Sequence, residues 1–196
     1  MKQIKEERTL VLVKPDGVMR GLTGEVIDRI EQRGLKIIAL KMMQVDRAHL
    51  EKHFPSDPEW AARLGDKGLK TFAEYKIDPK KHMGTDDRVK IGAKVKESLF
   101  DYMASGPIVA LVVEGIHAIE MVRKIAGDTL PVFAAIGSVR GDYSVDSPAV
   151  ANVEGRAIKN IMHASETPAE AKNEIDLWFT KDEIHDYQRA GQDVAY

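Results

Sequence analysis

Residues 160–167 read NIMHASET, a short apolar run that leads directly into the start of a helix. Thr167 can cap that helix, Pro168 suits its first position, and Glu170 completes a Thr-x-x-Glu capping box. The apolar residues before the cap favour a short strand. The pattern therefore predicts that His163 is held on a strand, four residues before the helix cap.

A partner for His163 is available on this helix. Glu174 lies about two turns into it and can fold back toward the imidazole. A carboxylate that fixes one ring nitrogen leaves the other free to act as a nucleophile or base. The alternative is a capped surface turn in which the histidine is incidental, and one short motif does not decide between the two.

Three further apolar runs, rich in Val, Ile and Leu, are typical of buried strands: Thr9–Val13, Leu35–Met43 and Ile108–Val113. Helical periodicity follows the first run over Gly24–Arg33 and the third over His117–Ala126, and a glycine ends each helix. A long irregular stretch then precedes the strand of His163. The order β-α-β-(helices)-β-α-β-α favours an α+β fold, the split β-α-β ferredoxin-like sandwich, with a four-stranded antiparallel sheet and helices on one face.

Composition excludes several classes of protein. The 196 residues suffice for about one domain with a sizeable core, since 43% are hydrophobic and 31% are charged. A net charge of −2 gives no electrostatic basis for general binding to nucleic acid or membranes. No apolar run approaches the roughly 18 residues of a membrane span, and the polar N-terminus has no signal-peptide core. The lack of cysteine excludes disulfides and thiolate chemistry and suits a cytoplasmic location.

Several separate motifs occur in order along the chain. They are ERTLVLVKPDGVMRG at residues 7–21, Glu114-Gly115, Arg123 with Thr129 six residues on, VRGDY at residues 139–143, and the stretch at residues 160–167. Together they resemble the nucleoside diphosphate kinases over most of residues 6–54 and 99–187. Agreement of several motifs in order is far more specific than any one of them.

The resemblance implies the same ferredoxin-like fold and a single domain over residues 1–196. Its main departure is residues 55–98, where compact members of the family have a much shorter helical hairpin. We expect helices over Trp60–Leu69 and Val89–Met103, separated by a loop that Pro and Gly punctuate. We interpret the stretch as an insertion that enlarges the hairpin over the nucleotide cleft. A surface extension is favoured over a new activity.

The resemblance also implies the chemistry, which is transfer of the γ-phosphoryl group from a nucleoside triphosphate to a nucleoside diphosphate. His163 would be the nucleophile of a ping-pong route, because a neutral imidazole is nucleophilic near pH 7 and its phosphoramidate can pass the group on. Glu174 would hold the other ring nitrogen, and Ser165 would steady Glu174. The alternative for Glu174 is an ordinary exposed carboxylate on a helix.

The same resemblance assigns the residues that bind the substrate. Lys14, Arg123 and Arg140 would collect the phosphates, since phosphoryl transfer depends on positioning and charge stabilisation. Guanidinium groups offer forked donors and lysine a mobile point charge, although each alone is more often a solvated surface cation. Lys14 would thereby assist catalysis and would join Asn160 in binding the sugar hydroxyl. Thr129 would add a hydroxyl to the phosphates.

Two of the implied binding residues depart from the family pattern or match only its apolar character. Phe54 stands where the family usually has a tyrosine near the phosphates, and Leu99 matches an apolar wall of the base cleft. The aromatic residue that usually stacks on the base has no clear match upstream of Leu99. Trp60, Phe72 or Tyr75 of the insertion could supply this ring. Because every base has a π-face, stacking predicts weak discrimination between bases.

The sequence lacks the motifs of other phosphate and metal sites. It has no G-x-x-x-x-G-K-[ST] loop, no kinase glycine loop and no H-E-x-x-H zinc spacing. We therefore expect no metal held by protein ligands, and Mg²⁺ carried on the nucleotide phosphates. The expected partners are nucleoside di- and triphosphates, and the family implies a homo-oligomer, either a hexamer or a tetramer.

Two rival functions follow from the same scaffold. The first is a non-catalytic, nucleotide-binding regulatory module, which would need phosphate ligands but no nucleophile such as His163. The second is a nucleic-acid-binding protein that uses aromatic residues on its sheet. The aromatic content of 6% and the acidic balance disfavour this second role.

Overall fold

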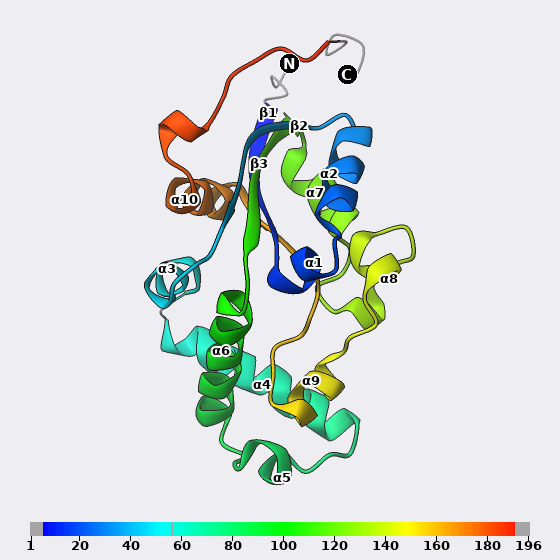
Figure 1. Ribbon diagram of the computed structural model, residues 1–196. Helices are drawn as coiled ribbons and strands as arrows, with labels where there is room; N and C mark the ends of the chain where they lie inside the picture. The colour runs from blue at the N-terminus through cyan, green and yellow to red at the C-terminus, as the bar shows by residue number, and fades with distance from the viewer. Residues whose placement is uncertain (1–5, 56, 191–196) are drawn as a thin grey trace, which may run out of the picture.

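The computed structural model describes residues 6–55 and 57–190, which form one sheet surrounded by helices (Figure 1). The strand order is β2-β3-β1-β4, and every neighbouring pair is antiparallel. This confirms the α+β, ferredoxin-like prediction. Within the described ranges, no helix is both long enough and apolar enough to cross a membrane. The strands are β1 (Glu6–Val13), β2 (Lys36–Met43), β3 (Ile108–Ile116) and β4 (Met162–Ala164).

Helices cover both faces of the sheet, so the expectation of helices on one face is wrong. Alternate side chains of β1 and β3 enter two separate apolar cores. Helices α2 and α7 complete one core, and α3, α6 and α10 complete the other. The reason lies in the central strands, which are continuous apolar runs of the kind that suits a sheet buried on both sides. The bounds of these helices are α2 (Thr23–Gln32), α3 (Arg47–His53), α6 (Arg88–Ala104), α7 (Ala118–Ala126) and α10 (Pro168–Trp178).

A helical hairpin extends away from the sheet over much of the expected insertion (Figure 1). It consists of α4 (Pro58–Glu74), α5 (Pro79–Met83) and α6 (Arg88–Ala104), so both long helices exceed their expected ranges. Two glycines permit α4 and α6 to cross closely. A Cβ atom on Gly92 would lie 1.9 Å from the carbonyl oxygen of Ala61, and one on Gly65 would clash with the backbone of α6 in the same way.

The hairpin is also stabilised by its own caps and core. Three aspartates cap its helices by accepting backbone N–H groups, each of which would otherwise lack a partner. Buried apolar side chains between the helices form a small core that is separate from the two cores of the sheet. The caps are Asp57, Asp78 and Asp87, and the core residues are Phe72, Met83 and Ile91.

The stretch between α7 and β4, expected to be irregular, contains short helices. They are η1 (Pro131–Phe133), α8 (Val139–Tyr143) and α9 (Pro148–Glu154). Ser138 caps α8 and Ser147 caps α9. Helices of this length span too few turns for their apolar periodicity to be recognised. The remaining elements are α1 (Pro15–Met19), which follows β1, and η2 (Lys181–Glu183), which follows α10.

The last described residues run beside the edge strand β2. The backbone N–H of His185 donates to the carbonyl of Ile38 at 2.8 Å, and the hydroxyl of Tyr187 donates to the carbonyl of Ile37 at 2.8 Å. This segment therefore covers the N-terminal half of β2. Further along the same strand, Leu40 and Met42 remain more than half exposed.

Candidate active site

His163 lies on β4, where it is paired with Leu12 of β1. The following helix begins as predicted, with Thr167 accepting a hydrogen bond from the N–H of Glu170. The cap differs from a complete capping box in one respect. The carboxylate of Glu170 accepts the N–H of Glu166, whereas in a capping box it would accept the N–H of Thr167. His163 is thus fixed between a central strand and a capped helix, and its side chain is 21% exposed.

Glu174 holds one nitrogen of the His163 ring, as predicted from the sequence. Nε2 lies 2.8 Å and 3.0 Å from the two carboxylate oxygens. Ser165 is fully buried, donates from Oγ to the Glu174 carboxylate at 2.6 Å, and accepts the N–H of Leu10. Burial alone would raise the pKa of Glu174, but hydrogen bonds from His163 and Ser165 hold this pKa below its ordinary value. The carboxylate is therefore charged, and the Nδ1 atom of His163 is left for other chemistry.

The turn before β4 is strained and firmly held. Ile161 has a φ of 70°, a left-handed conformation that is unfavourable for a β-branched residue. Its carbonyl accepts the N–H of Lys14 at 2.7 Å, and its own N–H donates to the Asp16 carboxylate at 3.2 Å. Gly17 permits this approach, since a Cβ there would lie 2.9 Å from the Ile161 oxygen. The hydroxyl of Tyr102, on α6, donates to the other oxygen of Asp16 at 2.5 Å.

A cleft of about 560 Å³ opens beside His163. Cations from separate parts of the chain line it, together with hydroxyl and amide groups. These are the features of a site for a phosphorylated ligand. It brings together six of the residues predicted from the sequence, namely Lys14, Arg123, Thr129, Arg140, Asn160 and His163.

Lys14 and Asn160 form the centre of this cleft. The Nζ atom of Lys14 donates to the Asn160 side-chain oxygen at 2.7 Å, and the Asn160 amide donates to the carbonyl of Thr129 at 2.9 Å. Burial, together with the positive charge of Arg140, lowers the pKa of Lys14 to about 7. These surroundings therefore disfavour the charge of Lys14, which an anionic ligand would restore.

Arg140 is almost fully buried, and three backbone carbonyls hold its guanidinium group. It donates to Asn160, Gly127 and Met162 at distances of 2.6–3.1 Å. Burial lowers its pKa to about 10, so it remains charged at neutral pH. The guanidinium group of Arg140 is thus held rigidly. Three of its five N–H groups donate to these carbonyls, which leaves the others for a ligand.

Arg123 and Thr129 lie at the exposed edge of the same cleft. Arg123 donates to the carbonyl of Glu166 at 3.3 Å and lies 3.8 Å from the carboxylate of that residue. Such exposed contacts are weak and easily exchanged for a ligand. This side chain is therefore free to turn toward a bound phosphate.

Phe54 and Leu99, the remaining predicted binding residues, do not line this cleft. Phe54 stacks against the rings of Trp60 and Phe100 at centroid distances of 5.9 Å and 5.6 Å. It lines a second cavity of about 670 Å³, together with Glu174. Leu99 lies half-buried on α6.

The three rings considered for base stacking also have different surroundings. Phe72 is buried in the core of the hairpin and is not available to a ligand. Trp60 is already stacked on Phe54, whereas Tyr75 is 49% exposed at the end of α4.

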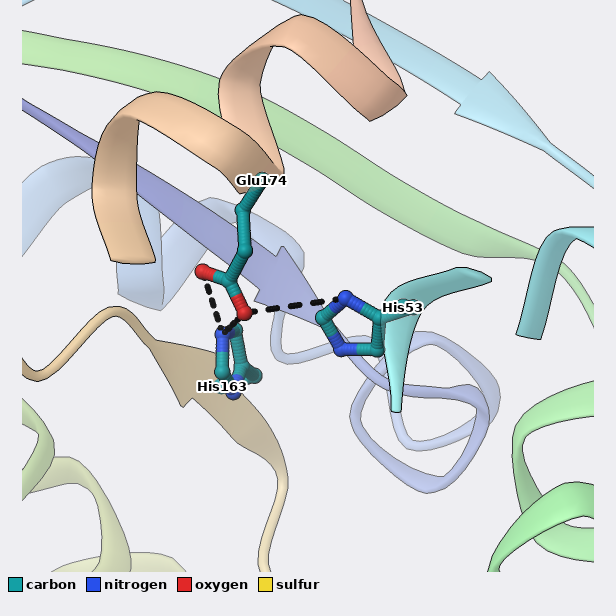
Figure 2. Close-up of side chains that lie close together, drawn as sticks. All are labelled: His53, His163 and Glu174. Carbon is teal, nitrogen blue, oxygen red and sulfur yellow. Dashed lines mark hydrogen bonds and ion pairs between the residues drawn. The ribbon is translucent and has the colours of Figure 1, made fainter. Parts of the chain in front are cut away.

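The sequence did not reveal one member of the site, His53. This residue ends α3, and its ring lies 5.1 Å from that of His163, with the two rings nearly perpendicular (Figure 2). Its Nδ1 atom lies 3.6 Å from the Glu174 carboxylate and accepts the indole N–H of Trp178 at 3.3 Å. Burial, reinforced by His163, lowers its pKa to about 3, so the ring is neutral. No spacing in the chain links His53 to the residues that it contacts.

Comparison with known sequences agrees with this geometry. The sequence model described as nucleoside diphosphate kinase matches residues 7–61 and 62–184. A nucleoside diphosphate kinase of Pyrobaculum aerophilum is 49% identical over 91% of this chain and 97% of its own length. Another, from Pyrococcus furiosus, is 40% identical over 94% of this chain and 89% of its own.

Solved structures show the same relationship. The crystal structure of an NDP kinase from P. aerophilum has a TM-score of 0.88 at 46% identity and covers 93% of this chain and 100% of its own. The nucleoside-diphosphate kinase of Borrelia burgdorferi, a transition-state mimic with bound vanadate and ADP, has a TM-score of 0.76 at 35% identity, covering 95% of each chain. A halophilic enzyme from Halobacterium salinarum in complex with CDP has a TM-score of 0.65 at 31% identity, covering 98% of this chain and 99% of its own.

Proposed function

The chain belongs to the nucleoside diphosphate kinase family, and we propose that His163 carries the transferred phosphoryl group as a phosphohistidine. The reaction moves the γ-phosphoryl group of a nucleoside triphosphate to a nucleoside diphosphate. The observation that carries the proposal is the pair formed by His163 and Glu174 beside a cleft lined by cations. A carboxylate fixed on Nε2 leaves Nδ1 as the nucleophilic atom.

The proposed first step is an in-line attack by the Nδ1 lone pair of His163 on the γ-phosphorus. The bond between this phosphorus and the bridging oxygen breaks, and the nucleoside diphosphate leaves with the electron pair. The proton on Nε2 stays directed at Glu174, whose charge stabilises the positive charge that develops on the ring. A second diphosphate then attacks the phosphohistidine by the reverse route, which restores the neutral imidazole.

The cations of the cleft stabilise the charge on the transferring group. Arg140 is the fixed donor, since backbone carbonyls orient it, while the exposed Arg123 closes on the phosphates when they bind. Thr129 adds a hydroxyl at the edge of the cleft. Lys14 and Asn160, already bonded to each other, take the sugar hydroxyl between them.

Mg²⁺ accompanies the nucleotide in this proposal. Among residues 6–55 and 57–190, the one group of three or more His or acidic side chains close enough to hold an ion includes His163 itself. The ligands of Mg²⁺ would therefore be phosphate oxygens and water, with no protein cage. When bound, the ion neutralises charge on the β- and γ-phosphates.

We further propose one domain over residues 1–196, with residues 55–98 as an insertion, and assembly into a homo-oligomer. Exposed apolar side chains support the assembly, both on the edge strand, at Leu40 and Met42, and in the stretch after α7, at Phe133 and Ile136. Sedimentation that gives the mass of a single chain would contradict it. The cysteine-free composition supports a cytoplasmic location.

The test of the phosphohistidine uses ATP labelled in its γ-phosphate, without an acceptor. The wild-type chain should retain a covalent label that is labile in acid and stable in base. His163→Ala should fold normally, take up no label, and lose turnover by at least about a thousandfold, the scale expected when a nucleophile is removed. His82→Ala is the matched control, because His82 lies in α5 and does not line the cleft. Near-normal transfer by His163→Ala would contradict the mechanism.

A further inference from the structure

We propose that His53, His163 and Glu174 form a binding site for one divalent transition-metal ion of the Zn²⁺ type, and that this ion inhibits the enzyme. The three side chains, called here the His-His-Glu triad, come from α3, β4 and α10 and converge on one point (Figure 2). Their ligand atoms all lie within 4.8 Å of one another.

The spacing of the triad is close to that of a metal site. Zinc bonds of about 2.0–2.1 Å in a tetrahedron place neighbouring ligand atoms about 3.4 Å apart. The Nδ1 atom of His53 is 3.6 Å from a Glu174 oxygen, and the Nε2 atom of His163 is 2.8 Å from the same oxygen. An ion would therefore require the His163–Glu174 pair to open slightly, while the ligand nitrogens of the two histidines already lie within 4.8 Å of each other.

The chemistry of the ligands selects the kind of ion. Two imidazoles and one carboxylate suit Zn²⁺, Cu²⁺ or Ni²⁺, whereas Mg²⁺ prefers an octahedron of oxygen ligands. Glu174 also receives a hydrogen bond from Ser165, the kind of support that orients a metal ligand. The Nδ1 atom of His53 accepts the indole N–H of Trp178, so this atom presents a lone pair and not a proton.

The triad is accessible from two sides. His163 lines the first cleft, of about 560 Å³, and His53 and Glu174 line the second cavity, of about 670 Å³. Three protein ligands leave a fourth position, which water from either side can fill. The indole N–H of Trp178, which now donates to His53, must give up this hydrogen bond when the ion binds.

Inhibition follows from the position of one proton. A neutral imidazole carries a single ring proton, and the charged Glu174 carboxylate, which can only accept, favours this proton on Nε2 of His163. A metal ion on Nε2 moves this proton to Nδ1, so the atom that should attack phosphorus becomes a donor. The binding of the ion stands on the geometry alone, whereas its effect on catalysis rests on the proposed role of His163.

Binding can be tested without turnover. Zn²⁺ titrated into the full-length, metal-free protein should bind at one tight site per chain by calorimetry, and Co²⁺ should give the visible absorption of a tetrahedral site. His53→Phe and Glu174→Gln should each weaken Zn²⁺ binding at least thirtyfold. His49→Phe is the matched control for His53, because His49 lies one turn earlier on α3 and also packs edge-on against Trp178, at 4.5 Å. It should keep its affinity within twofold.

The results separate the site from the inhibition. Unchanged Zn²⁺ affinity in both folded variants, or no saturable Zn²⁺ binding by the wild type, overturns the site. If His53→Phe does not fold, Glu174→Gln and His163→Asn decide the question. Zn²⁺ at the concentration that fills the site should also prevent labelling of His163 by ATP, and His49→Phe should remain sensitive. Full labelling with the site filled overturns the inhibition while leaving the site in place.

Discussion

Two regions of the molecule are built from contacts of different range in the sequence. One is the end of the sheet that carries His163, and the other is the α4–α6 hairpin. At the site, Lys14 donates a hydrogen bond to Asn160, which is 146 positions away in the sequence, and the N–H of Leu10 donates to Ser165, which is 155 positions away. In the hairpin, helices that follow one another in the chain pack through glycines and are capped by their own aspartates. A site that needs long-range contacts tolerates little change in its few residues, whereas a local hairpin can be enlarged without altering the chemistry.

The largest effect is expected from a substitution that forces the two long helices of the hairpin apart. Gly92→Leu places a side chain against the carbonyl of Ala61, where even a Cβ would lie at 1.9 Å. We expect a loss of about 3 kcal/mol in the free energy of unfolding, the upper part of the usual range for overpacking. Denaturant titration measures it. Gly24→Ala is the control, because a Cβ there meets nothing within 4 Å, and it should be neutral or stabilising.

The second prediction acts on the site and leaves the hairpin alone. Glu174→Gln keeps the size of the side chain but removes the charge that supports the His163 ring. We expect kcat to fall by about one to two orders of magnitude with nucleotide affinity nearly unchanged. Asp176→Asn, on the exposed side of the same helix, should leave kcat unchanged. A large change in Kd with kcat intact would place Glu174 in substrate binding.

The third prediction concerns pH and Lys14. Its pKa of about 7 means that the lysine loses its charge above neutral pH, so the binding of a phosphate there must be accompanied by uptake of a proton from solution. Nucleotide Kd should therefore rise up to about tenfold per pH unit above pH 7.5, where an ordinary lysine would still be charged. Calorimetry in buffers of different ionisation enthalpy should detect proton uptake. Lys14→Met should bind more weakly but without this dependence on pH.

The fourth prediction has the smallest effect and returns to the hairpin. Asp87 caps α6 by accepting the N–H groups of Val89 and Lys90, so Asp87→Ala should lower the free energy of unfolding by about 1 kcal/mol.

The preference among adenine, guanine, cytosine and uracil diphosphates should stay within about two orders of magnitude in kcat/KM, both in the wild type and in Asp87→Ala. A preference of four orders for one base, abolished by Asp87→Ala, would make the hairpin a specificity element.

The sequence predicted the parts of the site that depend on local order or on family motifs. His163 lies on β4, Glu174 lies on the capped helix α10, and Ser165 lies in the short connection between them, so their contacts follow from the turn at Thr167. The cations of the cleft could be placed because each sits in a motif of the family. The two-sided cover of the sheet was missed, although the continuous apolar strands indicate it.

What the sequence could not show are contacts between distant segments without a motif. His53 reaches Glu174 only because α3 and α10 pack on the same face of the sheet. Tyr102 reaches Asp16 only through the way in which α6 docks against the turn after β1. Such contacts depend on tertiary packing, which no local period or spacing encodes.

The pairing of β4 with β1 has a consequence for how the protein is made. Strand β1 leaves the ribosome before β4, which carries His163 and follows about 150 residues later. At about 5–20 residues per second, this separation means a delay of roughly 8–30 seconds. During this interval, the nascent chain has Lys14 but neither Asn160 nor His163 beside it. Nucleotide therefore cannot use this site to stabilise the growing chain, and catalytic capacity arises only after β4 has been made.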